Sequence, residues 1–432
     1  MSEQLHISDV ILDYISGDWG DDKPTEENSV KVACVRGADI NDVNASKFDT
    51  IPTRYISEGA LQRKCLPVGS IIIEKSGGTN TQSTGRVAYI SKECKEANEK
   101  IICSNFCVAF TVKPEWNARY IYNYLQYIYT TGAFFNYEGK TSGIHNLQVE
   151  QAFAAIPIDY IPKEAQKKAA NVIATIDRKI ALNRQINQNL EAFARQLYDY
   201  WFVQFDFPDT NGKPYKSSGG AMVWNEQLKR EIPKGWEVKT INDLAEVFNG
   251  ATPSTSDSLN YGGDIIWITP KDLSNQQSKF IIQGERNITD KGYGSCSTHL
   301  LPVDSILMSS RAPIGLFTIA KTELCTNQGF KSFVPKDKLQ NSYLYYYLLQ
   351  HKKQIERLGT GTTFKEVSRD DMLKFLVLTP NTNILHLFEE KAKAIGDEQL
   401  TIQNENSSLI KQRDELLPLL MNGQVNFDLS AC

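Results

Sequence analysis

The amino-acid sequence predicts an α+β protein in which two similar mixed α+β domains are each followed by a long helix. Two observations lead to this fold class. A series of short segments in the first half of the chain recurs in the same order in the second half, and both halves end in a long segment with the residue spacing of a coiled coil. The length of 432 residues agrees, because it exceeds one ordinary domain and favours two or three cores.

The recurrence is clearest in two stretches, LPVGSIIIEKSGG beginning at Leu66 and LPVDSILMSSRAP beginning at Leu301. Both pass from Leu-Pro through an apolar run into a polar loop. Neighbouring segments match as well: ISDV with INDL, VACVRGADI with IIWITPKDL, GRVAYI with GLFTIA, SNFCVAFTVKP from Ser104 with TNQGFKSFVPK from Thr326, ARYIYNYLQYIYTTG with NSYLYYYLLQHKKQ, and GKTSGIHNLQVEQAFAAIPI with GTGTTFKEVSRDDMLKFLVL. A shared order at low identity predicts one scaffold that carries two different surfaces.

Within each copy, stretches rich in β-branched and aromatic residues alternate with loops of Gly, Pro, Asn and Ser, and one helix-like segment lies near the end. The regular alternation of strands and helices that is typical of a parallel sheet is missing. We therefore expect a mixed α+β domain of roughly 150 residues in each half, at residues 1–160 and 232–381.

Each domain is followed by a segment with coiled-coil spacing. The segment from Pro162 to Trp201 contains no internal Gly or Pro, and steps of three and four residues define a seam along it. The expected seam positions are Ile173, Ile176, Ile180, Asn183, Asn187, Leu190, Ala194, Leu197 and Trp201. In the second segment the same phase selects Leu400, Gln403, Ser407, Ile410 and Leu417.

We interpret residues 161–206 and 382–424 as two long helices that pair with each other. The alternative is that each packs as an ordinary helix of a bundle. Polar residues at seam positions of both helices favour pairing, because facing polar residues can fix register and direction. Residues 207–231, rich in Gly, Pro, Ser and Lys, form a linker between the halves, and residues 425–432 form a tail.

No motif indicates a catalytic centre, a metal or a cofactor. The eight cysteines are scattered without a Cys-x-x-Cys pair, and the five histidines lack metal-ligand spacing. The stretch YEGKTSG has Phe134 where a phosphate-binding loop needs its first Gly. Motifs of amino-methyltransferases are missing too, so we expect a binding protein. The sequence start and the lack of a long apolar run predict a cytoplasmic location.

Polar loops at matched places of the two copies are the candidate binding surface. Arg, Lys, Asn and Gln can read base edges, and Ser, Thr and Lys can contact phosphates, whereas the simpler interpretation is that these loops only meet water. The net charge of −4 argues mildly against nucleic acid. The candidate DNA contacts are Lys75, Ser76, Asn80, Arg86, Lys140, Thr141, Ser142 and His145 in the first copy, and Lys271, Ser310, Arg311, Asn327, Gln328, Lys331, Thr362, Thr363 and Lys365 in the second.

Taken together, the pattern resembles the specificity subunit of a type I restriction-modification enzyme over nearly the whole chain. The stretches that carry the resemblance are REIPKGWEVKTINDLAEVFNGATP, GDIIWITPKDL, LPVDSILMSSRAPIG, TNQGFKSFVP, GTGTTFKEVSRDDMLKFLVLTP and FDFPDTNGKPYKSSGG. The first copy departs from it, with ISGDWGDDKP in place of IPKGWE and GATP, so the match does not extend to the loop at Asp18 and Trp19.

The resemblance implies that each domain is a target recognition domain that grips one half of a bipartite site on double-stranded DNA. It also implies that the helices form an antiparallel spacer and dock two methyltransferase subunits. Restriction and translocase subunits would join through the assembled complex. Such a chain is not itself catalytic, and it serves both methylation and restriction.

Two physical arguments agree with that expectation. A helix from Lys163 to Trp201 would be ~58 Å long, and half-sites one duplex turn apart are separated by ~34 Å. A stiff spacer can fix such a gap. The acidic net charge fits if companion subunits supply much of the phosphate contact.

The rival interpretations are a free-standing nuclease or methyltransferase and a duplicated protein-interaction scaffold. The sequence does not determine the target bases, because no code maps such loops to bases.

Overall fold

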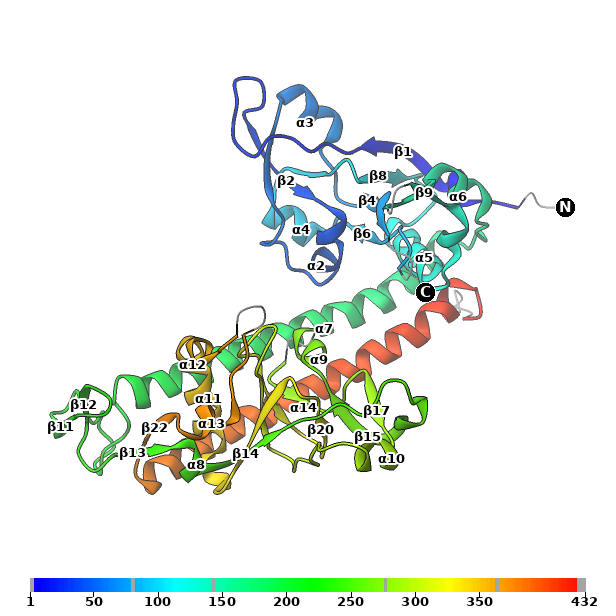
Figure 1. The fold of residues 1–432 in the computed structure, drawn as a ribbon. Helices are drawn as coiled ribbons and strands as arrows, with labels where there is room; N and C mark the ends of the chain where they lie inside the picture. Colours follow the sequence, from blue (N-terminus) through cyan, green and yellow to red (C-terminus); the bar gives the residue numbers. More distant parts are fainter. Residues whose placement is uncertain (1–3, 79–81, 142–143, 276–277, 362–364, 426–432) are drawn as a thin grey trace. The chain divides into compact units, whose positions relative to one another are not determined.

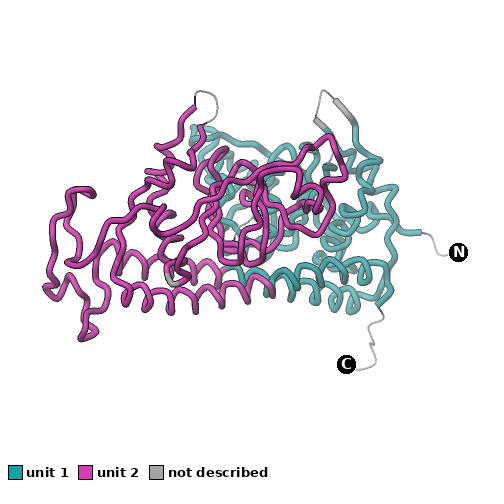
Figure 2. The backbone as a smooth tube through the Cα atoms, turned by 60° about the horizontal axis from the view of Figure 1, so that its bottom comes forward, with its two compact units in different colours: residues 1–184, 405–432 teal, residues 185–404 magenta. Residues whose placement is uncertain are grey.

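The computed structural model contains two compact units, each of which holds one copy of the repeat (Figures 1 and 2). Unit 1 consists of residues 1–184 and 405–432, and unit 2 of residues 185–404. Each long helix therefore contributes one part to each unit. The structure describes residues 4–78, 82–141, 144–275, 278–361 and 365–425.

The main sheet of unit 1 has four antiparallel strands in the order β1-β8-β4-β6. A second sheet has the order β3-β2-β7, with β2 and β7 parallel, and a third has the order β5-β10-β9. The strands are β1 (Ile11–Ser16), β2 (Val30–Val35), β3 (Thr53–Ile56), β4 (Ile71–Glu74), β5 (Ser76–Gly78), β6 (Val87–Tyr89), β7 (Ile101–Cys103), β8 (Cys107–Val112), β9 (Glu138–Thr141) and β10 (Ile144–Leu147). The helices are α1 (Ile7–Val10), α2 (Ile40–Asn44), α3 (Glu58–Lys64), α4 (Lys92–Ala97), α5 (Ala118–Thr130) and α6 (Val149–Ala155).

Unit 2 repeats this plan. Its main sheet has the order β14-β21-β18-β19-β16, and its second sheet, β17-β15-β20, again contains a parallel pair. The strands are β11 (Met222–Asn225), β12 (Arg230–Pro233), β13 (Glu237–Thr240), β14 (Ala245–Asn249), β15 (Tyr261–Ile268), β16 (Phe280–Ile281), β17 (Arg286–Ile288), β18 (Ile306–Ser309), β19 (Phe317–Ala320), β20 (Cys325–Thr326), β21 (Phe330–Pro335) and β22 (Leu376–Thr379). The helices are α8 (Ile241–Leu244), α9 (Pro270–Asn275), α10 (Asp290–Gly294), α11 (Asn341–Gln350), α12 (Lys352–Leu358) and α13 (Arg369–Leu373).

Both main sheets are covered on two faces, and the apolar runs of the repeat explain why. In β4, Ile71 and Ile73 join the core beneath α5, while Ile72 joins the core toward the second sheet. In β18, Met308 joins the core on one face of the sheet, and Leu307 joins the core on the other face. Successive side chains of a strand point to opposite faces, so a continuous apolar run requires cover on both sides.

Backbone hydrogen bonds confirm the repeat residue by residue. The Leu66 N–H donates to the Ile101 carbonyl at 2.8 Å, and the Leu301 N–H donates to the Leu324 carbonyl at 2.8 Å. One correction concerns the polar turns that precede β8 and β21. The strand registers place Cys107 opposite Glu74 and Phe330 opposite Ser309. Ser104 therefore corresponds to Asn327, one residue later than the sequence comparison placed it, because the polar turn offers no hydrophobic pattern to fix the alignment.

The two long helices, α7 (Lys163–Tyr198) and α14 (Thr382–Met421), pair antiparallel in both units (Figure 1). In unit 1 an Asn183 Nδ2–H donates to Glu405 at 2.6 Å, and Asp177 lies 3.5 Å from Arg413. In unit 2 an Asn187 Nδ2–H donates to the Gln399 carbonyl at 3.2 Å. Partner numbers fall as numbers along α7 rise, which defines the direction and confirms the expected fold class.

The covered face of α14 differs in part from the predicted seam. Leu417 is buried as expected, but Ser407 is exposed, and Gln399 is buried in place of the half-buried Leu400. Asn406, one residue before the predicted Ser407, is half-buried, and so is Arg413, seven residues further on. The true seam positions are therefore polar at Gln399, Asn406 and Arg413. A search for apolar spacing could not select them.

A buried polar network in unit 2 ties the repeat to both helices. Lys279, only 9% exposed, donates from Nζ to the Tyr346 hydroxyl at 2.8 Å. That hydroxyl donates to Glu191 of α7 at 3.1 Å, and a Gln399 Nε2–H of α14 donates to the same carboxylate at 3.3 Å. Burial lowers the pKa of Lys279 to about 8, although the charge of Glu191 opposes the shift.

The buried lysine makes the stability of unit 2 dependent on pH. Folded Lys279 loses its proton near pH 8, whereas the unfolded side chain keeps it to about pH 10.5, so this group contributes more stability as pH rises between those values. Relative to Lys279→Met, the wild type should gain about 2 kcal/mol of unfolding free energy from pH 8 to pH 10. Urea unfolding of both proteins at several pH values measures this, and a constant difference would contradict it.

A glycine at the same place in each copy gives a second prediction. A Cβ on Gly17 would lie 2.0 Å from the Ser104 carbonyl oxygen, and one on Gly250 would lie 2.1 Å from that of Asn327. Gly17→Ala and Gly250→Ala should each cost about 2–3 kcal/mol, since backbone must move to admit the methyl group. Gly294→Ala, where nothing lies within 4 Å, is the control and should be nearly neutral in thermal unfolding.

Candidate nucleic-acid interface

In unit 1, four loops meet at one end of the main sheet. The strands β1 and β4 end there and β8 begins there, because β8 runs antiparallel to both of its neighbours. We define the first loop cluster as residues 17–20, 75–78, 104–106, 138–141 and 144–147. Three backbone bonds join the loops: Asp18 N–H to the Cys103 carbonyl at 2.8 Å, Lys75 N–H to Phe106 at 2.7 Å, and Leu147 N–H to Lys75 at 2.8 Å.

Unit 2 has the same arrangement. We define the second loop cluster as residues 250–253, 310–313, 327–329, 360–361 and 365–366. The matching bonds are Ala251 N–H to the Thr326 carbonyl at 3.0 Å, Ser310 N–H to Gly329 at 2.7 Å, and Val367 N–H to Ser310 at 3.1 Å. The position of the loops is therefore set by the shared backbone, and the side chains on them are free to differ.

Two of the candidate DNA contacts of the first copy are held inside the unit. The Arg86 guanidinium donates to both carboxylate oxygens of Glu74, at 2.9 and 2.6 Å, and Glu74 is 2% exposed. These hydrogen bonds raise the pKa of Arg86. The His145 ring lies 2.7 Å from Glu138, and both side chains are buried. The geometry indicates that Arg86 and His145 stabilise the loops from the interior of the unit.

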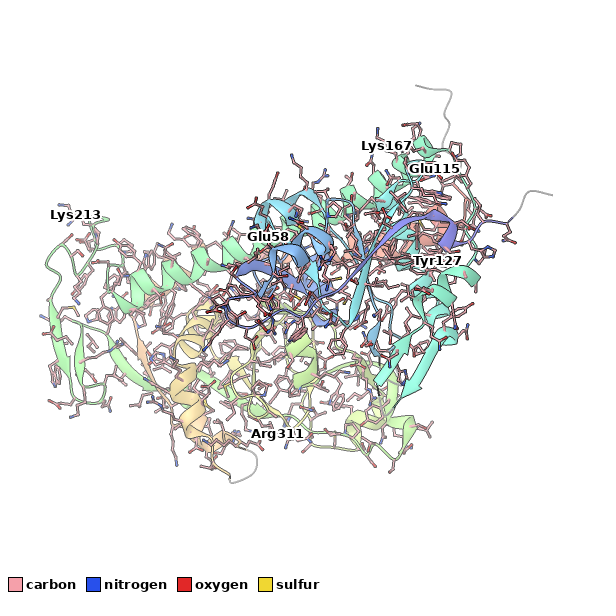
Figure 3. All side chains as sticks on the ribbon, turned by 90° about the horizontal axis from the view of Figure 1, so that it is seen from above. Glu58, Glu115, Tyr127, Lys167, Lys213 and Arg311 are labelled. Atoms are coloured by element: carbon pink, nitrogen blue, oxygen red, sulfur yellow. The ribbon has the colours of Figure 1, made fainter. Side chains whose placement is uncertain are left out.

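The second cluster contains a similar support. Lys331 Nζ donates to Glu366 at 3.1 Å and to the buried Ser310 hydroxyl at 3.4 Å, and its side chain is 6% exposed. Arg311 lies 3.9 Å from the same carboxylate but is 35% exposed, at the surface of unit 2 (Figure 3). Lys331 and Ser310 are thus internal in this conformation, while Arg311 is accessible.

The remaining candidates fall into three groups. Lys75, Ser76 and Asn327 are half-buried at the loops, and Lys271, Gln328 and Lys365 are exposed. Among the exposed residues, Lys271 is paired with Glu285 at 2.7 Å. Asn80, Ser142, Thr362 and Thr363 lie outside the described residues, as do the side chains of Lys140 and Thr141.

The sequence comparison missed the aromatic residues of the first cluster. Trp19 is half-buried and packs edge-on against Phe106 at 6.2 Å between ring centroids, and Phe106 is 51% exposed. The Arg54 guanidinium lies 4.5 Å from the Trp19 ring centroid. A correct alignment of the turn before β8 would have placed Trp19 and Phe106 at the matched loop positions.

The described part of the chain holds no group of three or more His, Cys, Asp or Glu residues arranged to bind a metal ion. Burial raises the pKa of Cys34 and of Cys107 to about 12, so these thiols are poor ligands and poor nucleophiles. Among the helices of the described residues, none has the length and apolar character to cross a membrane.

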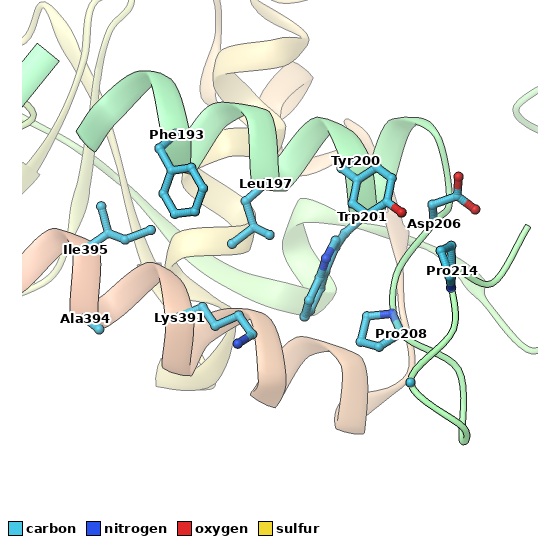
Figure 4. A pocket seen from close by; sticks show the side chains of 11 residues that line it. Phe193, Leu197, Tyr200, Trp201, Asp206, Pro208, Pro214, Lys391, Ala394 and Ile395 are labelled. Carbon is cyan, nitrogen blue, oxygen red and sulfur yellow. The ribbon is translucent and has the colours of Figure 1, made fainter. Parts of the chain in front are cut away.

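A second surface is an apolar groove of about 620 Å³ in unit 2 (Figure 4). Phe193, Leu197 and Tyr200 line one side, and Ala394 and Ile395 of α14 line the other. Phe193 is 57% exposed. An exposed apolar surface of this kind is typical of a protein contact.

Comparison with known proteins identifies the family. A family model described as the type I restriction modification DNA specificity domain matches residues 24–192 and, a second time, residues 233–416. The chain belongs to the type I restriction-modification DNA specificity family. The two matches correspond to the two copies, each with a large part of the long helix that follows it.

Relatives in the specificity family match different lengths of the chain. Over 151 residues it is 48% identical to the type I restriction enzyme MjaIX specificity subunit of Methanocaldococcus jannaschii, an alignment that covers 33% of this chain and only 35% of that protein. It is 29% identical over 323 residues to the HindI specificity subunit of Haemophilus influenzae, covering 63% of this chain and 70% of that one. The fold is similar to the S subunit of a type I system from M. genitalium, with a TM-score of 0.57 at 14% identity over 99% of this chain and 96% of that chain.

The buried ion pair of the specificity domain in unit 1 gives a stability prediction. Arg86→Met leaves the Glu74 carboxylate buried without its partner and should cost about 3–5 kcal/mol. The double variant Glu74→Gln/Arg86→Met should recover much of that loss, because no charge is then left buried. Lys75→Ala, at a half-buried loop position, should change stability by less than about 0.5 kcal/mol. Denaturant unfolding of the four proteins tests this, and a neutral Arg86→Met would contradict it.

Proposed function

We propose that this chain is the DNA-recognition subunit of a type I restriction-modification complex, needed for both methylation and restriction. Each copy of the repeat reads one half of an asymmetric, bipartite target on double-stranded DNA. Helices α7 and α14 serve as the spacer and dock two methyltransferase subunits, and restriction subunits join through the assembled complex. The chain has no catalytic role of its own and uses no cofactor.

The observation that carries this proposal is the pair of loop clusters. The same three backbone bonds hold the same four loops in each unit, yet the side chains differ at matched positions. Glu74 and Arg86 form an ion pair in the first copy, whereas the matched residues in the second are Ser309 and Leu316, joined by a hydrogen bond of 2.8 Å from the Leu316 N–H. Two similar readers with different surfaces suit a target with two different halves.

Partner docking is supported by the exposed apolar side chains of the long helices. On α7, Leu182 is 51% exposed and Phe193 is 57% exposed, and on α14 Leu387 is 42% exposed. The groove beside Phe193 adds concave apolar surface. These features suit helix or loop contacts from methyltransferase subunits. Because the chain carries a net charge of −4, those subunits would supply much of the contact with the DNA phosphates.

A catalytic alternative and a scaffold alternative make different predictions. Pure protein incubated with DNA and either Mg²⁺ or labelled S-adenosylmethionine should neither cut nor methylate it. A protein-interaction scaffold would assemble with partners but tolerate loss of the exposed cations in the loop clusters. No observation in either unit favours one of these alternatives over DNA recognition.

Arg311 and Lys75 test the DNA surface directly. In the complex assembled with its methyltransferase subunits, Arg311→Ala and Lys75→Ala should each lower DNA affinity about tenfold and reduce the salt dependence of binding, because a cation near the duplex is lost. Lys213→Ala, which removes an exposed linker cation outside both clusters, is the control (Figure 3). Binding titrations at several salt concentrations measure the effect. Wild-type affinity in both loop variants would count against this surface.

Adenine-methylation mapping of the source genome tests the function as a whole. Deletion of the gene should remove one split, asymmetric methylated motif. Exchanging the first domain for that of a relative should change only one half of the motif, because each domain is proposed to read one half. An unchanged methylation pattern after deletion would contradict the proposal. The isolated chain should bind DNA weakly and lose that binding as salt rises.

A further inference from the structure

The two loop clusters differ in chemistry at one matched place among the described residues. The bonds from Asp18 and Ala251 make Trp19 the counterpart of Thr252. The bonds from Lys75 and Ser310 make Phe106 the counterpart of Gly329. An aromatic pair in the first copy therefore replaces a threonine and a glycine in the second.

The aromatic pair is held firmly although Phe106 is half exposed. The Phe106 carbonyl accepts hydrogen bonds from the N–H groups of Lys75 at 2.7 Å and Ser76 at 3.2 Å. The Trp19 ring packs edge-on against the Phe106 ring. The Arg54 guanidinium lies over the face of the Trp19 ring. Arg54 is itself paired with Asp22, and its side chain is 12% exposed. A supported aromatic ring needs little further ordering when it makes a contact.

The loop that carries Trp19 is fixed as well. Lys64 Nζ donates to Asp18 at 2.7 Å, and the other oxygen of this carboxylate accepts the Gly20 N–H at 3.1 Å. Gly20 has a φ of +60°, and a Cβ there would lie 2.6 Å from the Tyr55 carbonyl oxygen. Any side chain at residue 20 would disturb this packing, so Gly20 helps to fix the position of Trp19.

The second cluster presents hydrogen-bonding groups at and beside this place. Gln328 matches Asn105, the exposed residue before Phe106. The Thr252 hydroxyl donates to the Gln328 side-chain oxygen, and Gln328 is exposed. Asn327 accepts the Gly329 N–H at 2.9 Å, which shapes the turn. The bond from Thr252 uses the side-chain oxygen of Gln328, and the amide N–H groups of Gln328 can donate to an acceptor on a base edge.

We infer that Phe106, backed by Trp19, contacts the C5-methyl group of a thymine in the half-site read by the first copy, while Gln328 and Thr252 read the matched place of the other half-site by hydrogen bonds. The inference rests on the proposed function. The thymine methyl is the apolar group that a base edge offers in the major groove, and an exposed phenyl ring beside the Lys75 loop suits it. Burial of one methyl group against the ring corresponds to roughly a fourfold preference.

The test uses the assembled methyltransferase complex and a duplex with the methylated motif of the source genome. Each thymine of the first half-site is replaced in turn by deoxyuridine, which removes only the methyl group, and kcat/KM for methylation is measured. One replacement should lower the wild-type value roughly fourfold. The same replacement should have no further effect in Phe106→Ala, because the contact is already lost.

Three controls make the outcome specific. Phe135→Ala removes another exposed aromatic ring of unit 1 and should keep the deoxyuridine effect. Phe106→Leu should retain part of it. Replacements in the second half-site should act equally on wild type and Phe106→Ala. Thermal unfolding verifies that the variants are folded.

The inference is overturned if every deoxyuridine effect is the same in wild type and Phe106→Ala, or if the first half-site contains no thymine. In both cases DNA recognition by the two copies still stands. If the complex methylates no split motif that depends on this chain, the proposed function fails instead. The two failures are therefore distinguishable.

Discussion

The structure depends on one set of backbone hydrogen bonds at the end of each main sheet. In the first copy they link Lys75 to Phe106 and to Leu147, and in the second Ser310 to Gly329 and to Val367. Because these bonds involve main-chain atoms, any side chain compatible with the turn can occupy the loops. Scaffold and surface are thereby separated. One fold can hold two different sets of side chains in the same geometry.

The buried charges serve this separation. In the first copy, the buried Glu74 pairs with Arg86 next to the loops and holds them in place. In the second copy, the buried Lys331 holds Glu366, a half-buried residue of the second loop cluster itself. A buried ion pair adds little net stability, but loss of either partner is costly. Such a pair therefore favours one loop conformation over others. The exposed residues in front, among them Arg311 and Phe106, can vary without this cost.

The helix pair uses polar residues in a comparable way. Asn183 with Glu405 in unit 1, and Asn187 with Gln399 in unit 2, bond across the antiparallel seam. A purely apolar seam would permit a shift of register at small cost, whereas these bonds are satisfied in one register. The Lys279 network adds a third connection, from the repeat through Tyr346 to Glu191 of α7. Each copy and its adjoining helix segments therefore form one compact unit.

The sequence by itself determined the duplication, the α+β class and the existence of two paired helices, because apolar spacing and turn residues report directly on local structure. It also singled out polar loops that the structure places together at one end of each main sheet. Only the tertiary structure decided which side chains in them face outward. Arg86 and Lys331 are basic loop residues in the sequence, yet the carboxylates that bury them come from positions far along the chain or from another strand. Only the fold shows that the ring of Trp19, in a loop outside the resemblance, lies against the ring of Phe106, in the turn that was aligned one residue off. The polar positions Gln399, Asn406 and Arg413 of α14 recur every seven residues, but a search for apolar residues passes over them, and only packing against α7 shows that they are covered.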